Sequence, residues 1–173
     1  GGSSRMWLFM YACYGLTLTS FTLLAATGLQ GYAGFALGGL NHPRLAILTA
    51  ILYLFTQTLV IFFYIGTGST VKEYVKQNSE FGESYKKAQA IKGKVFLHIM
   101  LNILLVLGVF IAGGAVDTGH MPRWMHGLLF LASLIHFGWT IRIEHHSFRE
   151  TAAIILEMYG LKPNSLGRAE PPF

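Results

Sequence analysis

Two apolar runs, Val95–Ala115 and Trp124–Ile143, constrain the fold of this chain more than any other feature. Each run is about as long as the roughly 20 residues that an α-helix needs to cross the hydrocarbon core of a bilayer. Only a short turn separates them, and a helix satisfies its own backbone groups inside lipid. The sequence therefore predicts an antiparallel helical hairpin in a membrane.

Two further runs of the same kind precede this hairpin, over Met6–Gly28 and Leu45–Ile65. Only 12% of the residues are charged, whereas a soluble domain has about 25%. The sequence predicts an all-α integral membrane protein, a single four-transmembrane-helix bundle over residues 5–162. Cys13 is the only cysteine, so an intrachain disulfide is excluded.

The segments between and after the spans are assigned by their composition. The first four residues, GGSS, are interpreted as a cloning remnant. Residues 66–94 are polar and rich in lysine, and are predicted to be a loop that is helical in part, with a break near Gly82. Residues 144–160 contain no helix breaker before Gly160 and are expected to extend the last span as a helix. Residues 163–173 are expected to be a loose tail.

The distribution of lysine and arginine predicts the orientation in the membrane. Eleven of these residues fall on the side of the chain ends and of residues 66–94, and only Arg44 and Arg123 fall on the other side. Positive residues favour the cytoplasm, so both termini are predicted to be cytoplasmic. In a bacterium this would be the inner membrane. The net charge of +5 is explained in this way, without nucleic-acid binding.

A short sequence similarity between two parts of the chain suggests two repeated helical hairpins. Residues 35–39 (FALGG), followed by His42-Pro43-Arg44, resemble residues 110–114 (FIAGG), followed by His120-Met121-Pro122-Arg123. A duplication of this kind is common in membrane proteins. The alternative is that short turns outside the membrane simply favour Gly, Pro and Arg. If the repeat is real, Gln57 should occupy the place of His136.

The histidines are the candidate ligands, because an ionisable residue inside a span is expensive and suggests a function. With a rise of about 1.5 Å per residue, His98 is about 6 Å beyond Lys94 and His136 is about 9 Å before Arg142, so the two should be level. They are the favoured pair of ligands, and His42 and His126 are the second pair. Polar neighbours are expected to orient the imidazoles, namely Asn102, Gln57, Tyr64 and Tyr11.

Imidazole nitrogen is a ligand for haem iron and for bare copper, iron or zinc. The leading hypothesis is therefore a b-type haem or metal-binding protein that serves electron transfer or redox sensing, with a quinone or a membrane redox protein as partner. His98 and His136 would be the ligands of a bare metal as well. One alternative is an accessory subunit of a larger membrane complex, in which the histidines only pack. Another is a small transporter or proton-conducting homo-oligomer. Whether the protein is an enzyme stays open.

Overall fold

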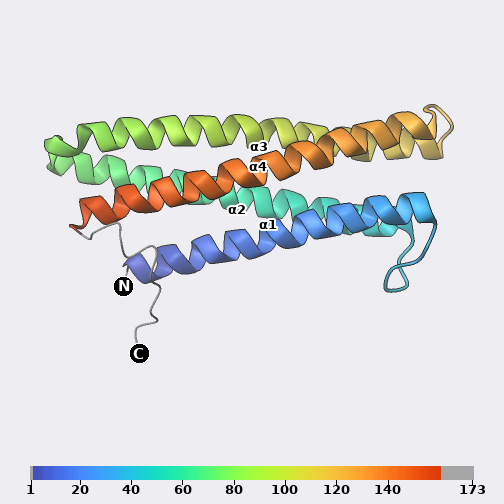
Figure 1. Ribbon diagram of the computed structural model, residues 1–173, viewed down its shortest axis with the longest axis horizontal. Helices are drawn as coiled ribbons and strands as arrows, with labels where there is room; N and C mark the ends of the chain where they lie inside the picture. The colour runs from blue at the N-terminus through green and yellow to red at the C-terminus, as the bar shows by residue number, and fades with distance from the viewer. Residues whose placement is uncertain (1, 161–173) are drawn as a thin grey trace.

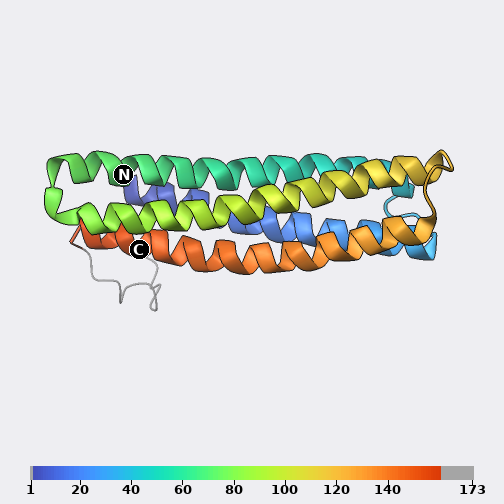
Figure 2. The ribbon, with the colours of Figure 1, turned by 90° about the horizontal axis from the view of Figure 1, so that it is seen from above.

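The computed structural model describes residues 2–160, which form a bundle of long antiparallel helices (Figures 1 and 2). The helices are α1 (Gly2–Ala33), α2 (His42–Gln77), α3 (Gly82–Asp117) and α4 (Arg123–Met158), with a short 3-10 helix, η1 (Ser79–Phe81), between α2 and α3. The predicted tail over residues 163–173 lies outside the described residues.

The four long helices surround one interior. α1 and α3 each contact both α2 and α4, so α2 and α4 face each other diagonally across the bundle. The start of α1, the end of α4 and the α2–α3 connection lie at one end of the bundle, which we call the basic end (Figure 1). Residues 34–41 and 118–122 connect the helices at the other end, the loop end.

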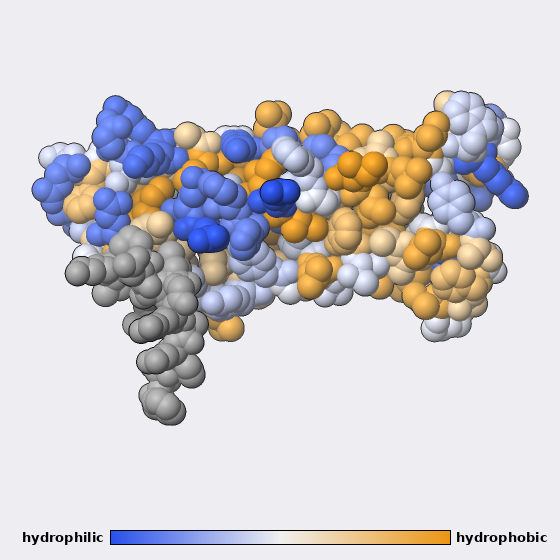
Figure 3. Space-filling view, viewed as in Figure 1, coloured by the Kyte–Doolittle hydropathy of each residue, from blue (hydrophilic) through white to orange (hydrophobic). Residues whose placement is uncertain are grey.

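All four helices are long and apolar enough to cross a membrane. Many large apolar side chains point outward, and Figure 3 shows the apolar surface at the centre and toward the loop end, with hydrophilic atoms gathered toward the basic end. Such a surface is suited to lipid and not to water. The predicted all-α, four-helix membrane bundle is therefore confirmed. A helix of 36 residues is about 54 Å long, so the helices project beyond a hydrocarbon core of about 30 Å.

The connection between α2 and α3 is much shorter than the sequence suggests. α2 continues through the glycines at 66 and 68 to Gln77, and the predicted loop over residues 66–94 is mostly the ends of α2 and α3. Val71 is completely buried in a cluster with Ile154 and Ile155 of α4. This packing outweighs the weak helix propensity of glycine, which costs only about 1 kcal/mol per residue.

Hydrogen bonds between helices hold the interior. Ser20 and Thr56 hydroxyls lie 2.9 Å apart, and so do those of Thr27 and Thr49. The Tyr53 hydroxyl donates to Asn102 Oδ1 over 2.7 Å and joins α2 to α3. Because lipid offers no competing hydrogen bonds, such buried polar pairs fix how membrane helices meet.

Gln30 of α1 anchors the α1–α2 loop, because its Nε2 donates to the Leu40 carbonyl over 2.6 Å. Gly34, Gly38 and Gly39 have positive φ angles, which allow the chain to turn back within a few residues. Asn41 then caps α2, accepting a hydrogen bond from the Arg44 backbone N–H. These contacts place His42 at the first turn of α2, facing the bundle.

Candidate functional site

A cavity of about 720 Å³ lies inside the loop end and is lined by residues of all four helices. Its volume is in the range of about 300–1,000 Å³ that is usual for small-molecule and cofactor sites. Two histidines line it, His42 at the start of α2 and His126 at the start of α4. Because α2 and α4 are diagonal, these imidazoles come from opposite sides of the interior.

The His42 ring is held by a backbone carbonyl. Its Nδ1 lies 3.0 Å from the Thr27 oxygen. A carbonyl can only accept a hydrogen bond, so Nδ1 carries the proton and Nε2 keeps a free lone pair. This is the arrangement in which histidines bind metals, with the second ring nitrogen donating to a carbonyl.

Each of these histidines also packs closely against a glycine of the preceding helix. A Cβ added at Gly31 would lie 2.9 Å from His42 Cε1, and one added at Gly113 would lie 3.4 Å from His126 Cε1. A side chain at Gly31 would displace the His42 ring, whereas a Cβ at Gly113 would just touch the His126 ring. The two glycines therefore give both imidazoles room at the wall of the cavity.

His126 resembles His42 in its surroundings. Its Nδ1 is buried without a hydrogen bond of good geometry, and the Val109 backbone carbonyl lies beside the ring. Val109 comes four residues before Gly113, just as Thr27 comes four residues before Gly31. A small rotation of the His126 ring would give it the same carbonyl contact, and the same free Nε2, as His42.

His98 and His136, the favoured pair, do lie together, with ring centroids 5.8 Å apart. However, His136 Nδ1 faces the Asn102 amide nitrogen over 3.2 Å, while Asn102 Oδ1 accepts from Tyr53. His136 Nδ1 must therefore accept, and its proton sits on Nε2. In that tautomer the buried Nε2 carries a hydrogen that has no acceptor within residues 2–160, and it has no lone pair for a metal ligand bond.

Some of the predicted polar neighbours of the histidines lie in the interior of the bundle, and others lie at its surface. Asn102 and Tyr64 are buried, and Tyr64 donates to the Glu144 backbone oxygen. Gln57 is buried too, but it lies beside Glu144 and not at the position predicted from His136. Tyr11 is 61% exposed, so it does not line the interior as predicted. It lies one helical turn from Trp7 on the outer face of α1, and Tyr14 takes the inner position.

The buried positions show the two hairpins in a different register from the predicted one. Buried residues of α1 recur in α3 at one constant separation, and those of α2 recur in α4 at another. The matching pairs are Cys13 and Val95, Ser20 and Asn102, Leu24 and Val106, Thr49 and Ser133, Tyr53 and Phe137, and Thr56 and Thr140. In this register His42 corresponds to His126, not to His120, and Gly31 corresponds to Gly113. The predicted register is wrong because it aligns the turns, which differ in length, and not the packed faces.

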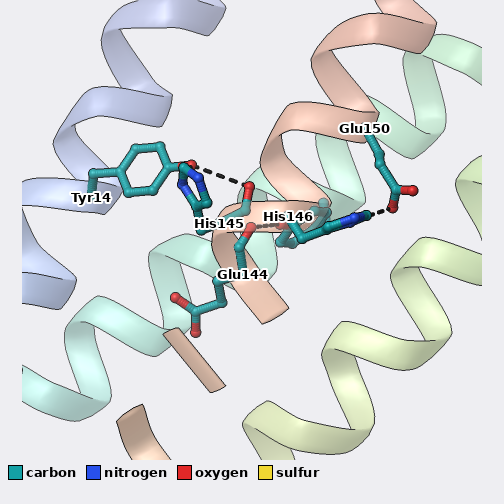
Figure 4. Close-up of polar contacts among 6 residues, drawn as sticks. Tyr14, Glu144, His145, His146 and Glu150 are labelled. Carbon is teal, nitrogen blue, oxygen red and sulfur yellow. Dashed lines mark hydrogen bonds and ion pairs between the residues drawn. The ribbon is translucent and has the colours of Figure 1, made fainter. Parts of the chain in front are cut away.

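Glu144 is the residue that sequence reasoning missed. Its position beside Arg142 and two histidines suggests the headgroup region, yet its side chain is buried. His145 and His146 point outward instead, toward Tyr14 and Glu150 respectively (Figure 4). The spacing of Thr140, Glu144, Ser147 and Thr151 along one helical face was the available indication, and all four are buried.

Across residues 2–160, no group of three or more His, Cys, Asp or Glu side chains is placed to hold a metal ion. Comparisons with protein-family models, curated proteins and solved structures found no match to this chain. The fold and the cavity define its class, a four-helix transmembrane protein with a two-histidine cavity at the loop end of the bundle.

Proposed function

We propose that this protein binds a b-type haem in the loop-end cavity and serves membrane electron transfer. His42 and His126, from the diagonal helices α2 and α4, would hold the haem iron. Bound haem would supply a reversible one-electron centre. The chain's own residues would hold it, shield it from water and fix the orientation of both imidazoles.

The observation that carries the proposal is the hydrogen bond of His42 Nδ1 to the Thr27 carbonyl. It leaves Nε2 available to bind iron, whereas the Asn102 contact ties His136 to the other tautomer. The structure thus favours the second histidine pair over the first.

The walls of the cavity fit a large apolar ring with acidic substituents. They consist mainly of aliphatic and aromatic side chains, including Leu24, Val106 and Phe130. Arg123 also lines the cavity, and its guanidinium is suited to pair with a carboxylate. Gly28 allows the Phe130 ring to pack directly against α1, because a Cβ at position 28 would overlap that ring.

A quinone is the electron partner that we propose, since it travels within the lipid. Ile47 and Phe110 line the cavity and are also exposed on the outer surface of the bundle. An apolar partner can therefore approach the cavity from the lipid side. With both termini cytoplasmic, as the positive residues favour, the cavity would face the periplasm of a bacterial inner membrane.

The visible absorption spectrum tests this function. Protein produced with sufficient haem should show a Soret band that sharpens on reduction with dithionite. His42→Ala and His126→Ala should each abolish haem retention, while His98→Ala and His136→Ala should retain it. His120→Ala is the matched control, because His120 is exposed and bonds only to Thr118.

Two glycine substitutions provide a second, geometric test. Gly31→Leu should displace His42 and lower the bound haem, whereas Gly15→Leu on the same helix should not, because nothing lies within 4 Å of a Cβ at Gly15. If the purified protein is colourless under all conditions, the accessory-subunit hypothesis becomes the better one. If only His98→Ala and His136→Ala lose haem, the choice of ligands made here is wrong.

A further inference from the structure

Three buried polar side chains from three helices meet inside the bundle, away from the histidine cavity. Thr17 of α1 is 3% exposed, Gln57 of α2 is 0% exposed and Glu144 of α4 is 2% exposed. The Thr17 hydroxyl and the Gln57 amide lie beside the Glu144 carboxyl. Figure 4 shows the Glu144 side chain pointing away from the contact between Tyr14 and His145.

Within the described residues, several buried polar atoms of these side chains have no hydrogen-bond partner. Thr17 Oγ1, Gln57 Oε1, Gln57 Nε2 and Glu144 Oε1 all lack a partner of good geometry. In folded proteins nearly all buried polar atoms have a partner, either protein or ordered water. Four such atoms on three adjoining side chains indicate that the cluster holds something further, and a water molecule needs only two to four polar partners.

The surroundings of Glu144 carry no compensating positive charge. Among residues 2–160, the ion pairs are Glu73 with Lys76, Glu83 with Lys86 and His146 with Glu150, so none of them includes Glu144. The titratable groups that face it are neutral thiol and phenol groups at pH 7, namely Cys13 and Tyr14 on α1 and Tyr53 and Tyr64 on α2. From α3, the adjoining core receives the apolar side chains Val95 and Ile99.

An ionised carboxylate in this place would be buried without a positively charged partner, which is strongly unfavourable. We propose that Thr17, Gln57 and Glu144 form a proton-binding site, in which Glu144 carries the proton as a carboxylic acid and a bound water joins the three side chains. Proton uptake converts the carboxylate to the acid, and release returns the proton to water, so no other reactant is needed.

Two buried hydroxyl side chains lie between this site and the basic end. Ser147 and Thr151 follow Glu144 along the same buried face of α4, one helical turn apart. Such hydroxyls both donate and accept hydrogen bonds, so they can pass a proton through intervening water. The site includes none of the proposed haem ligands, and it does not depend on the proposed function.

Infrared spectroscopy of the protein in sodium-free lipid vesicles at pH 7 tests the proposal directly. The wild-type protein should show the carbonyl stretching band of a protonated carboxyl group, shifted to lower frequency in heavy water. Glu144→Gln should lose this band. Glu150→Gln, which changes an exposed carboxyl on the same helix, should keep it, and helical content by circular dichroism should be unchanged in both variants.

Two variants of neighbouring residues test the same proposal independently. Gln57→Leu and Thr17→Val should shift the frequency of the band without removing it, because each removes a neighbour of the carboxyl, and they serve if Glu144→Gln does not fold. The proposal is overturned if the band is missing in the wild type, or if neither neighbour variant shifts it. It is also overturned if sodium chloride abolishes the band reversibly, since the site would then bind a metal cation.

Discussion

The hydrogen bond between Tyr53 and Asn102 is predicted to be a measurable part of the stability of the bundle. The Tyr53 hydroxyl is buried, and Asn102 Oδ1, 2.7 Å away, is its acceptor. Hydrogen bonds between membrane helices contribute about 0.6 kcal/mol on average and about 1.7 kcal/mol at most. Because this bond is short and buried, Tyr53→Phe should cost about 1–1.7 kcal/mol, in the upper part of that range.

Asn102→Leu should cost more, because Asn102 also donates to the Ser133 carbonyl and contacts His136 Nδ1. With about 1–1.7 kcal/mol for the Tyr53 bond and the average value for each of the other two contacts, the cost is about 2.2–2.9 kcal/mol. In the Asn102→Leu background, Tyr53→Phe should cost nothing further, since the phenol has already lost its acceptor. The coupling in the double-mutant cycle should therefore equal the cost of Tyr53→Phe alone.

Reversible unfolding in mixed micelles of lipid and denaturing detergent measures these free energies. Tyr74→Phe is the matched control, because Tyr74 donates to the Met158 carbonyl, and it lies about 31 Å from Tyr53 along α2 at the usual helical rise. Its effect should add to that of Asn102→Leu without coupling. Additive effects of Tyr53→Phe and Asn102→Leu would refute the network, and with it the argument for the tautomer of His136.

Two further predictions concern topology and the projecting part of the bundle. In a Cys13→Ala background, a cysteine at Gly39 should react with a membrane-impermeant reagent added to intact cells, whereas a cysteine at Lys86 should react only after permeabilisation; the opposite pattern would reverse the predicted orientation. Phe148→Ala should destabilise the bundle by about 3–5 kcal/mol, because its ring is buried among aromatic side chains of α1 and α2. Phe55→Ala, at an exposed position, should stay within about 0.5 kcal/mol, and equal effects of the two would contradict the packing described here.

The fold could be predicted because hydropathy and helix length are properties of local sequence. The spans over residues 95–115 and 124–143 lie entirely within α3 and α4. The ends of the helices could not be predicted in the same way. α2 passes through Gly66 because Val71 packs against α4, and that contact is distant in sequence.

For the candidate site, too, features set by local sequence could be predicted, and features set by distant contacts could not. Counting residues from the nearest charges correctly predicts that His98 and His136 are level, and their rings are in fact neighbours. The counting could not predict which ring nitrogen carries a proton, since Tyr53 on α2 determines that through Asn102. Counting also could not predict that Glu144 is buried, because only the rotation of α4 about its axis, which packing fixes, decides which way position 144 points.

The two proposed sites lie at different levels of the bundle. His126 and Glu144 lie on the same helix, and the rise of about 1.5 Å per residue separates them by about 27 Å, close to the thickness of about 30 Å of a hydrocarbon core. Between them, Phe130 and Phe137 pack with Leu24 and Val106, and Ser133 and Thr140 are buried on the same stretch of α4. Glu144 lies closer along α4 to the end of the helix at Met158 than to His126, so a proton there should exchange with water at the basic end. Electron exchange at the cavity and proton exchange at Glu144 would then occur at different faces of the membrane.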